Sequence, residues 1–345
     1  MIATKEITQH KSRITGKSWQ TLNSVYYDCH VVSLAQILPK ELYYPWLTLT
    51  ALPFIESQWR GLSCRNALDS EHKRDEVLFD QMGLSKQLVP ITGDLEQQIR
   101  STVEEQGYCI CRVDSYYHEH FDEFYLKEHR TNGHKVTVID WDDEYYYGID
   151  NLGIKTLVMA FRRDWFIESI RSNLFHVYEK EDTFYYLPDD SITSAMTLLS
   201  NHQTRVVNAI THWATHRKAN ADAFDTYFSQ FSDDLEAGMP RTYAQVHNSY
   251  TTALMIETAY TAILESWEYD PMPWQRVLPD SQEVFEALSI CVKAWRMFKM
   301  QCKSRDVSVA VSDKQLLTIL NQVVERENQL SALVQQSIKT LTELV

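Results

Sequence analysis

The stretch NGHKVTVIDWDDEYYYGIDNLG, residues 132–153, decides the fold of the first half of the chain. Two runs rich in aromatic and β-branched residues flank the polar residues 142–144, which is the pattern of a β-hairpin. His134 opens the first run and Asp150 closes the second. These two ends lie side by side in an antiparallel hairpin, so the imidazole and the carboxylate are predicted to meet. The Asp150 carboxylate, or the side-chain amide of the neighbouring Asn151, would orient the imidazole and leave its other nitrogen as a base.

A nucleophile for this base is predicted at Cys29. The stretch VYYDCHVVSLAQIL, residues 25–38, carries apolar residues at helical spacing, so a helix is predicted to begin near Cys29 and to end before Pro39. The positive end of a helix dipole favours the thiolate form of a cysteine. The alternative is that Cys29 is a small buried apolar residue, and its local sequence leaves both readings open.

Composition and charge narrow the class of protein. The 345 residues are 44% hydrophobic and 23% charged, which predicts one large or two ordinary globular domains. A formal net charge of −14 argues against partners such as nucleic acid or an anionic membrane. No apolar run approaches the ~18 residues of a membrane span. The first thirty residues lack a signal-peptide core, and the six cysteines are scattered, so we expect a cytoplasmic protein with free thiols.

Further elements are predicted on either side of the hairpin. Residues 93–107 form an amphipathic helix closed by Gly107. Residues 108–114 form a buried strand that places Cys109 and Cys111 on one face, where core packing is favoured over metal binding. Strands are also predicted at residues 155–161 and 184–187, with a short helix at 164–174 between them.

The pattern becomes helical after residue 190. This change predicts an α+β domain at 1–190 and an all-α domain at 191–345, which would act as a lid, a substrate-binding element or an oligomerisation element. Amphipathic segments are predicted near residues 191–217, 221–236, 241–268, 280–303 and 313–344. An apolar stripe on the last segment is compatible with a homodimer and equally with burial under the other helices.

Histidines cluster just before the hairpin. His118, His120, His129 and His134 fall within seventeen positions, and such tracts can ligate zinc. Their spacing matches no compact zinc motif. We therefore predict a polar loop beside the active site and no bound metal.

The order Cys29, His134, Asp150 resembles the papain-like superfamily. The pattern VDSYY (113–117), a polar loop, and then GH-x-V-x-V-x-x-x-D-D…D is similar to the N-terminal domain of the butirosin-biosynthesis acyltransferase family, as is the helix start DCHVVSLAQIL. The resemblance covers about residues 22–190, and C39-type peptidases share its GH…D element. The bulky pair His30-Val31 and a single glycine before His134 depart from the family pattern, and no motif covers the helical half.

The resemblance implies an acyltransferase of antibiotic or nonribosomal-peptide biosynthesis. Members of the family move an acyl group from the phosphopantetheine thioester of an acyl or peptidyl carrier protein to a small-molecule amine. It implies Cys29 as nucleophile, His134 as base and Asp150 as the residue that orients it. The oxyanion donors would be the backbone N–H of Cys29 and the side chain of Asn23, with Gln20 as the alternative. The enzyme itself would hold no cofactor, since the carrier protein brings the phosphopantetheine.

Two other functions are compatible with the same residues. A cysteine peptidase or amidohydrolase of papain-like fold would use the same triad but transfer the acyl group to water. A non-catalytic scaffold would retain the fold without depending on Cys29.

Overall fold

The computed structural model describes residues 4–7, 9–20, 34, 37–58, 61–66, 79–80, 82–91, 93–118, 126–127, 129, 134–151, 156–176, 184–236, 243–305 and 313–344. It combines helices with an antiparallel sheet, so the fold is α+β, as predicted. The chain forms two compact units, which we call the sheet unit (residues 1–43 and 79–197) and the helical unit (residues 44–78 and 198–345). Within the described ranges, no helix has the length and apolar character needed to cross a bilayer.

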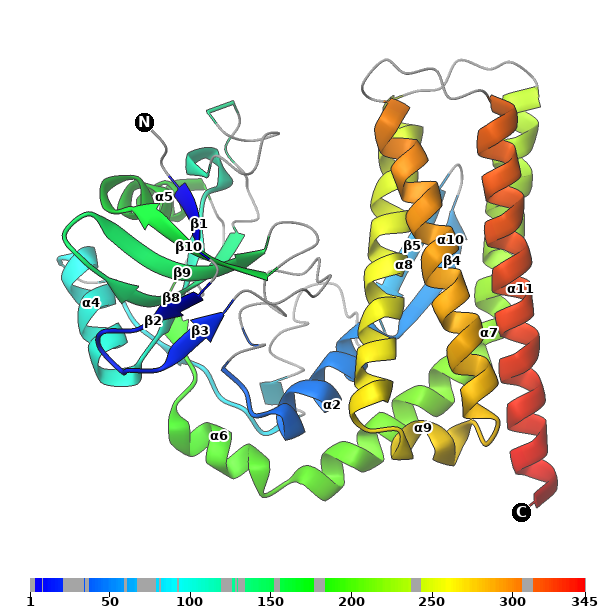
Figure 1. Ribbon diagram of the computed structural model, residues 1–345, viewed down its shortest axis with the longest axis horizontal. Coiled ribbons are helices and arrows are strands. Elements are labelled where there is room, and N and C mark those ends of the chain that lie inside the picture. The colour runs from blue at the N-terminus through cyan, green and yellow to red at the C-terminus, as the bar shows by residue number, and fades with distance from the viewer. Residues whose placement is uncertain are drawn as a thin grey trace. The chain divides into compact units, whose positions relative to one another are not determined.

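The sheet unit is built on a seven-stranded antiparallel sheet of described strands, with the order β1-β10-β9-β8-β7-β11-β6 (Figure 1). The predicted hairpin lies at its centre as β8 and β9, and the predicted strands at 108–114, 155–161 and 184–187 are also present. The strand bounds are β1 (Thr4–Ile7), β6 (Gln87–Leu88), β7 (Cys109–Val113), β8 (His134–Trp141), β9 (Tyr145–Asn151), β10 (Thr156–Arg162) and β11 (Phe184–Tyr186).

Helices α4 (Leu95–Gln106) and α5 (Arg163–His176) contribute to the core against this sheet. The Asp94 carboxylate caps α4 by accepting the backbone N–H groups of Glu96 and Gln97. Gly107 ends it with a φ of 81°, a left-handed conformation that glycine adopts without strain. The predicted amphipathic helix is therefore confirmed together with its closing glycine.

Cys109 and Cys111 are fully buried in the core between the sheet and these helices, as predicted. Their Sγ atoms lie 3.6 Å apart on one face of β7. Burial raises the pKa of Cys109 well above its ordinary value. The thiol therefore stays protonated and unreactive at neutral pH.

A small ribbon of β2 (Gln9–Lys11) and β3 (Ser18–Gln20) lies in the N-terminal part of the chain. It is tied to the central hairpin through Asp140, which is fully buried. His10 Nε2 lies 2.9 Å from an Asp140 carboxylate oxygen, and the backbone N–H of Arg13 donates to the same oxygen at 2.8 Å. The His10 ring also stacks on Tyr147, with the ring centroids 4.3 Å apart.

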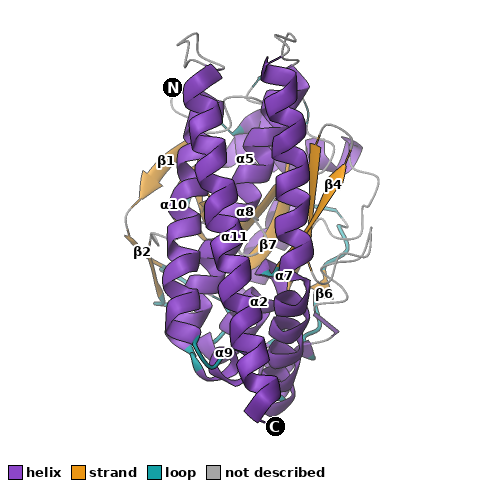
Figure 2. Ribbon diagram, turned by 90° about the vertical axis from the view of Figure 1, so that its right-hand side faces the viewer, coloured by secondary structure: helices purple, strands orange, loops and turns teal. Residues whose placement is uncertain are grey.

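The helical unit contains four long helices that run alongside one another (Figures 1 and 2). Its described helices are α7 (Leu199–Glu236), α8 (Tyr243–Tyr269), the short α9 (Met272–Val277), α10 (Ser281–Arg305) and α11 (Asp313–Leu344). The predicted break between residues 217 and 221 was wrong, because α7 is continuous through Lys218-Ala219-Asn220. That segment contains neither Gly nor Pro to end a helix. The first part of the segment predicted at 191–217 is instead a separate helix, α6 (Asp189–Met196), in the sheet unit.

Residues 44–78 belong with the long helices, which differs from the predicted single boundary at residue 190. Tyr44 of α2 (Lys40–Ala51) stacks on Tyr269 of α8, with ring centroids 4.1 Å apart. The hairpin of β4 (Pro53–Gln58) and β5 (Gly61–Asn66) packs on α7 and α8, and Asn220 donates to the Pro53 carbonyl at 3.1 Å. These contacts join residues far apart in the sequence, so a local change of pattern does not mark the boundary.

One buried carboxylate joins all four long helices. Glu327 of α11 forms an ion pair with Arg217 of α7, and accepts hydrogen bonds from Tyr260 of α8 at 3.1 Å and Trp295 of α10 at 2.5 Å. Arg217 and Glu327 are 0% and 1% exposed. Burial alone would lower the pKa of Arg217, but the adjacent Glu327 outweighs it and holds that pKa above its ordinary value. The arginine is therefore charged, and depends on the carboxylate for compensation.

Replacing this carboxylate is expected to destabilise the helical unit strongly. Glu327→Ala leaves Arg217 charged and buried without its counter-ion, which should lower the free energy of unfolding by about 3–5 kcal/mol. The matched control is Glu325→Ala on the same helix, where the side chain is 59% exposed and the change should stay within about 0.5 kcal/mol. Urea unfolding followed by tryptophan fluorescence measures both. Equal effects of the two substitutions would contradict the role given to Glu327.

Candidate functional site

His134 and Asp150 form a buried hydrogen-bonded pair at one end of the sheet. His134 Nε2 lies 2.5 Å from Asp150 Oδ1, and the two residues are 3% and 1% exposed. A carboxylate only accepts, so Nε2 carries the donated proton and Nδ1 is the nitrogen that would exchange a proton with a nucleophile. The structure thus brings together the two residues that the hairpin pattern predicted to meet.

The strand register explains why the two side chains meet. Thr137 pairs with Ile149 and Val138 with Gly148, so His134 and Asp150 lie diagonally across the hairpin on the same face. Gly148 lies two residues before Asp150 on β9, and neighbouring atoms leave no room for a side chain there. A Cβ at this position would lie 2.8 Å from the Val136 side chain and 3.1 Å from the Thr137 carbonyl oxygen. A larger residue at this position would force the Val136 side chain or the backbone of β8 to shift.

Cys29 and Asn23 lie outside the described residues, and so does the helix predicted to begin near Cys29. Gln20 ends β3, where its backbone pairs with Gln9, and its side chain is outside the described part. Asn151 ends β9, and its side chain is likewise not described. The described part of the predicted triad therefore consists of His134 and Asp150.

His118 lies beside this pair. It follows the short 3-10 helix η1 (Ser115–Tyr117) and is 1% exposed. Its ring meets His134 edge-on with the centroids 6.4 Å apart, and meets Phe161 with the centroids 5.2 Å apart. A second buried imidazole therefore lies next to His134.

A second histidine–carboxylate pair lies in the same region, and sequence reasoning did not predict it. His129 Nδ1 is 2.7 Å from Asp114 Oδ2, and Asp114 is fully buried while the His129 side chain is 40% exposed. Ser172 of α5 donates to the same carboxylate oxygen at 2.7 Å. The available signal was an aspartate directly after a buried strand, followed by several histidines.

A metal ion was considered for the histidine-rich tract. Among the residues that the structure describes, no three His, Cys, Asp or Glu side chains converge as metal ligands would. His120 lies outside that set. Each described histidine of this tract is instead placed beside an aspartate or another histidine.

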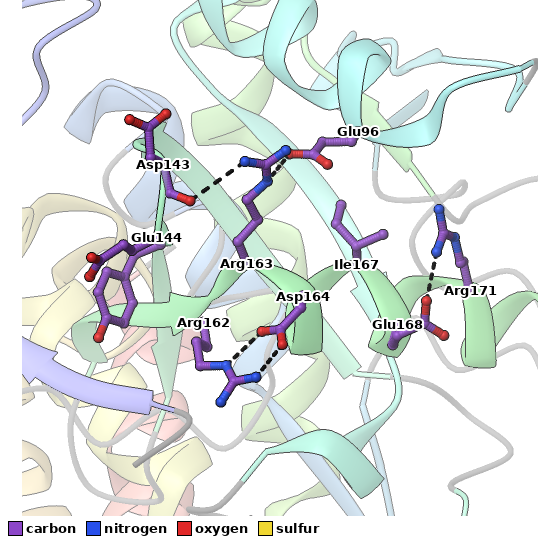
Figure 3. Close-up of a pocket in the computed structure, with 10 residues that line it drawn as sticks. Glu96, Asp143, Glu144, Arg162, Arg163, Asp164, Ile167, Glu168 and Arg171 are labelled. Atoms are coloured by element: carbon purple, nitrogen blue, oxygen red, sulfur yellow. Dashed lines mark hydrogen bonds and ion pairs between the residues drawn. The ribbon is translucent and has the colours of Figure 1, made fainter. Parts of the chain in front are cut away.

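An open groove of about 790 Å³ lies at the other end of the strands (Figure 3). Tyr145, in its lining, begins β9 and is five residues from Asp150, which corresponds to about 16 Å along a strand. The groove is lined by both acids and arginines, and the arginines are paired within it: Arg162 with Asp164, Arg163 with Glu96, and Arg171 with Glu168. This internal compensation leaves no excess of positive charge to attract an anion.

Comparisons with known proteins leave the family open, because no family model and no curated protein matches the chain. The resemblance to the butirosin-biosynthesis acyltransferases therefore depends on the short motifs around Cys29, His134 and Asp150.

Removing the Asp150 carboxylate is expected to destabilise the sheet unit. Asp150→Ala leaves the buried imidazole of His134 without its hydrogen-bond acceptor, which should cost about 1–3 kcal/mol of unfolding free energy. Asp150→Asn keeps the side-chain volume and should cost less. The control is Asp143→Asn in the exposed turn between β8 and β9, which should change stability by less than about 0.5 kcal/mol. Denaturant unfolding measures all three, and an Asp150→Ala protein as stable as the control would contradict the buried pair.

Proposed function

We propose that this protein is a cysteine-dependent acyltransferase of papain-like fold that acts in antibiotic or nonribosomal-peptide biosynthesis. Cys29 is the nucleophile, His134 its base and Asp150 the residue that orients the base. The single observation that carries the proposal is the buried hydrogen bond of 2.5 Å between His134 and Asp150. The order of the three residues along the chain and their motifs supply the rest of the support.

Burial suits this pair to proton transfer. Because Asp150 accepts from Nε2, the neutral imidazole has its lone pair at Nδ1, and the imidazolium that forms during reaction is stabilised by the carboxylate. Exclusion of water from a residue that is 3% exposed strengthens this electrostatic effect. A cysteine thiol that gives its proton to Nδ1 becomes the thiolate that attacks an acyl group.

The first half of the reaction transfers the acyl group to the enzyme. The Cys29 thiolate attacks the thioester carbon, a new C–S bond forms, and the bond to the phosphopantetheine sulfur breaks. The leaving thiolate takes the proton held by His134, so that His134 becomes neutral. The backbone N–H of Cys29 and the side chain of Asn23 or Gln20 would stabilise the oxyanion of the intermediate.

The donor would be an acyl or peptidyl carrier protein, and a basic surface would favour its docking if it is acidic. The arginines of the groove in Figure 3 are poorly suited to bind an acidic carrier protein, since each is paired with a carboxylate. Segment 293–303 of α10 contains four Lys or Arg residues and no acid, and two of these cations, Arg296 and Lys299, are paired with Glu257 of α8. Met297 and Met300 on this segment are 45% and 61% exposed, and exposed methionines adapt readily to a partner surface.

Intact-protein mass spectrometry tests the proposal. After mixing with an acyl-pantetheine thioester, the wild-type protein should gain the mass of one acyl group, and Cys29→Ala should gain none. His134→Gln should acylate about 10²-fold or more slowly, because it lacks the base. Cys302→Ala, at a buried cysteine of α10, is the matched control and should behave like the wild type.

The same experiment separates the alternatives. An adduct that is released without an added amine would indicate a hydrolase of the same fold. An equal adduct on Cys29→Ala would contradict Cys29 as the nucleophile. No adduct and no peptide cleavage across a panel of substrates would favour the scaffold.

A further inference from the structure

Helix α10 carries apolar side chains on two opposite faces. The inner face packs into the core of the helical unit, and its buried members are Val284, Leu288, Cys291, Trp295, Phe298 and Cys302. On the other side, Ile290 and Met297 are each 45% exposed and Met300 is 61% exposed. Of the seven large apolar side chains that are exposed among the described residues, three therefore lie on this one helix. A helix at the surface of a bundle normally presents polar residues outwards, so a second apolar face indicates a contact with another molecule.

The exposed residues form one row along the helix. Six exposed positions recur at alternating spacings of three and four residues, which places them on one side of the helix: Glu283, Glu286, Ile290, Lys293, Met297 and Met300. We call this row the outer face of α10. At a rise of 1.5 Å per residue, the row extends over about 26 Å. It is therefore long enough to lie along another helix over several turns.

The charges on the outer face are separated along the helix. The acids Glu283 and Glu286 lie in its first half, and Lys293 lies in its second half. None of these three groups forms an ion pair with a residue that the structure describes. A second cation, Arg296, flanks the row; it is paired with Glu257 of α8, and its side chain is 49% exposed. One end of the outer face is therefore negative and the other is positive.

This separation of charge decides between two kinds of partner. An acidic carrier protein would be attracted by Lys293 but repelled by the two acids of the same row. A second copy of α10 that runs in the opposite direction avoids this conflict. With a two-fold axis halfway between residues 286 and 293, each Glu286 faces the partner's Lys293, and each Glu283 lies opposite the partner's Arg296. The outer face is thus complementary in charge to a reversed copy of itself.

The apolar residues fit the same arrangement. Ile290 lies half a residue from the midpoint between residues 286 and 293, so the two copies of Ile290 meet at the centre of the contact. Met297 then lies opposite the partner's Gln282, and Met300 opposite the exposed Pro279 just before the partner's α10. The flexible side chain of methionine adapts to such surfaces. An apolar centre with charged groups around it is the usual composition of a specific protein interface.

We propose that the outer face of α10 is the contact surface of a homodimer, in which two copies of α10 pack antiparallel about a two-fold axis. Each copy contributes the same residues, so the contact closes on itself and produces dimers rather than longer chains. One helix from each copy makes a small interface, and we expect a dissociation constant in the micromolar range. Formation of the dimer does not depend on the chemistry proposed for Cys29.

Sedimentation velocity of the full-length protein over a series of concentrations tests the proposal. The wild type should change from monomer to dimer as the concentration rises. Ile290→Glu should weaken association by more than about tenfold, because it places two like charges at the centre of the contact. The matched control is Met272→Glu on α9, whose side chain is 56% exposed and lies outside the outer face. It should leave the dissociation constant unchanged, and circular dichroism should show both variants folded.

Reversal of single charges tests the antiparallel register. Glu286→Lys and Lys293→Glu should each weaken the homodimer about tenfold, because residues 286 and 293 of the two copies then carry like charges. When the two variants are mixed, they should form a heterodimer, since each altered charge faces an opposite one on the partner. The double variant, with both substitutions on one chain, keeps the net charge of −14 and should regain the dissociation constant of the wild type.

Four results would overturn the proposal. The first is a wild type that stays monomeric up to about 0.1 mM. The second is a dimer that survives Ile290→Glu, or that Met272→Glu weakens equally, because the contact would then lie on another surface. The third is a pair of single charge variants that do not associate on mixing, which would exclude the antiparallel register. The fourth is a monomeric wild type that binds a carrier protein and loses it in Ile290→Glu, which would assign the outer face to that partner.

Discussion

A buried carboxylate must be hydrogen-bonded or paired with a charge, and this constraint organises the sheet unit. Asp114, Asp140 and Asp150 are each at most 1% exposed, and each is paired with a histidine. The pair with His10 attaches the N-terminal ribbon to the central hairpin, and the pair with His129 joins that residue to Asp114, directly after β7. The pair with His134 lies within the central hairpin.

The histidine–aspartate hydrogen bond has different roles in these pairs. His10 is further fixed by stacking on Tyr147, and Asp140 also accepts a backbone N–H, which is a structural role. His134 is buried at the end of two neighbouring strands, where a precise ring orientation is of use to a base. In the helical unit, Glu327 satisfies the same constraint by joining one residue from each of the other three long helices. Pairing of buried acids therefore supports both stability and the candidate chemistry.

The sequence allowed the central hairpin to be predicted because its signal is local: two β-rich runs, a polar turn and the geometry of antiparallel strands place His134 next to Asp150. Contacts between distant segments left no such signal. Asn220 bonds to Pro53 and Tyr44 stacks on Tyr269, so the helical unit includes a hairpin that appeared to belong to the first domain. The Asp114–His129 pair was missed for the same reason, since it spans fifteen residues without a repeating pattern. The segments predicted separately at 191–217 and 221–236 belong to one continuous helix, α7, from residue 199, because no Gly or Pro separates them.

The central claim is that Cys29 lies against the Nδ1 side of His134, and chemical cross-linking tests it most directly. Dibromoacetone has two electrophilic carbons and joins a thiol to an imidazole only when both lie within a few ångströms of each other. Peptide mapping after treatment should find Cys29 linked to His134, and Asp150→Asn should reduce the yield of this link. A reagent molecule attached to Cys29 alone, or a link from His134 to another cysteine, would contradict the proposed triad.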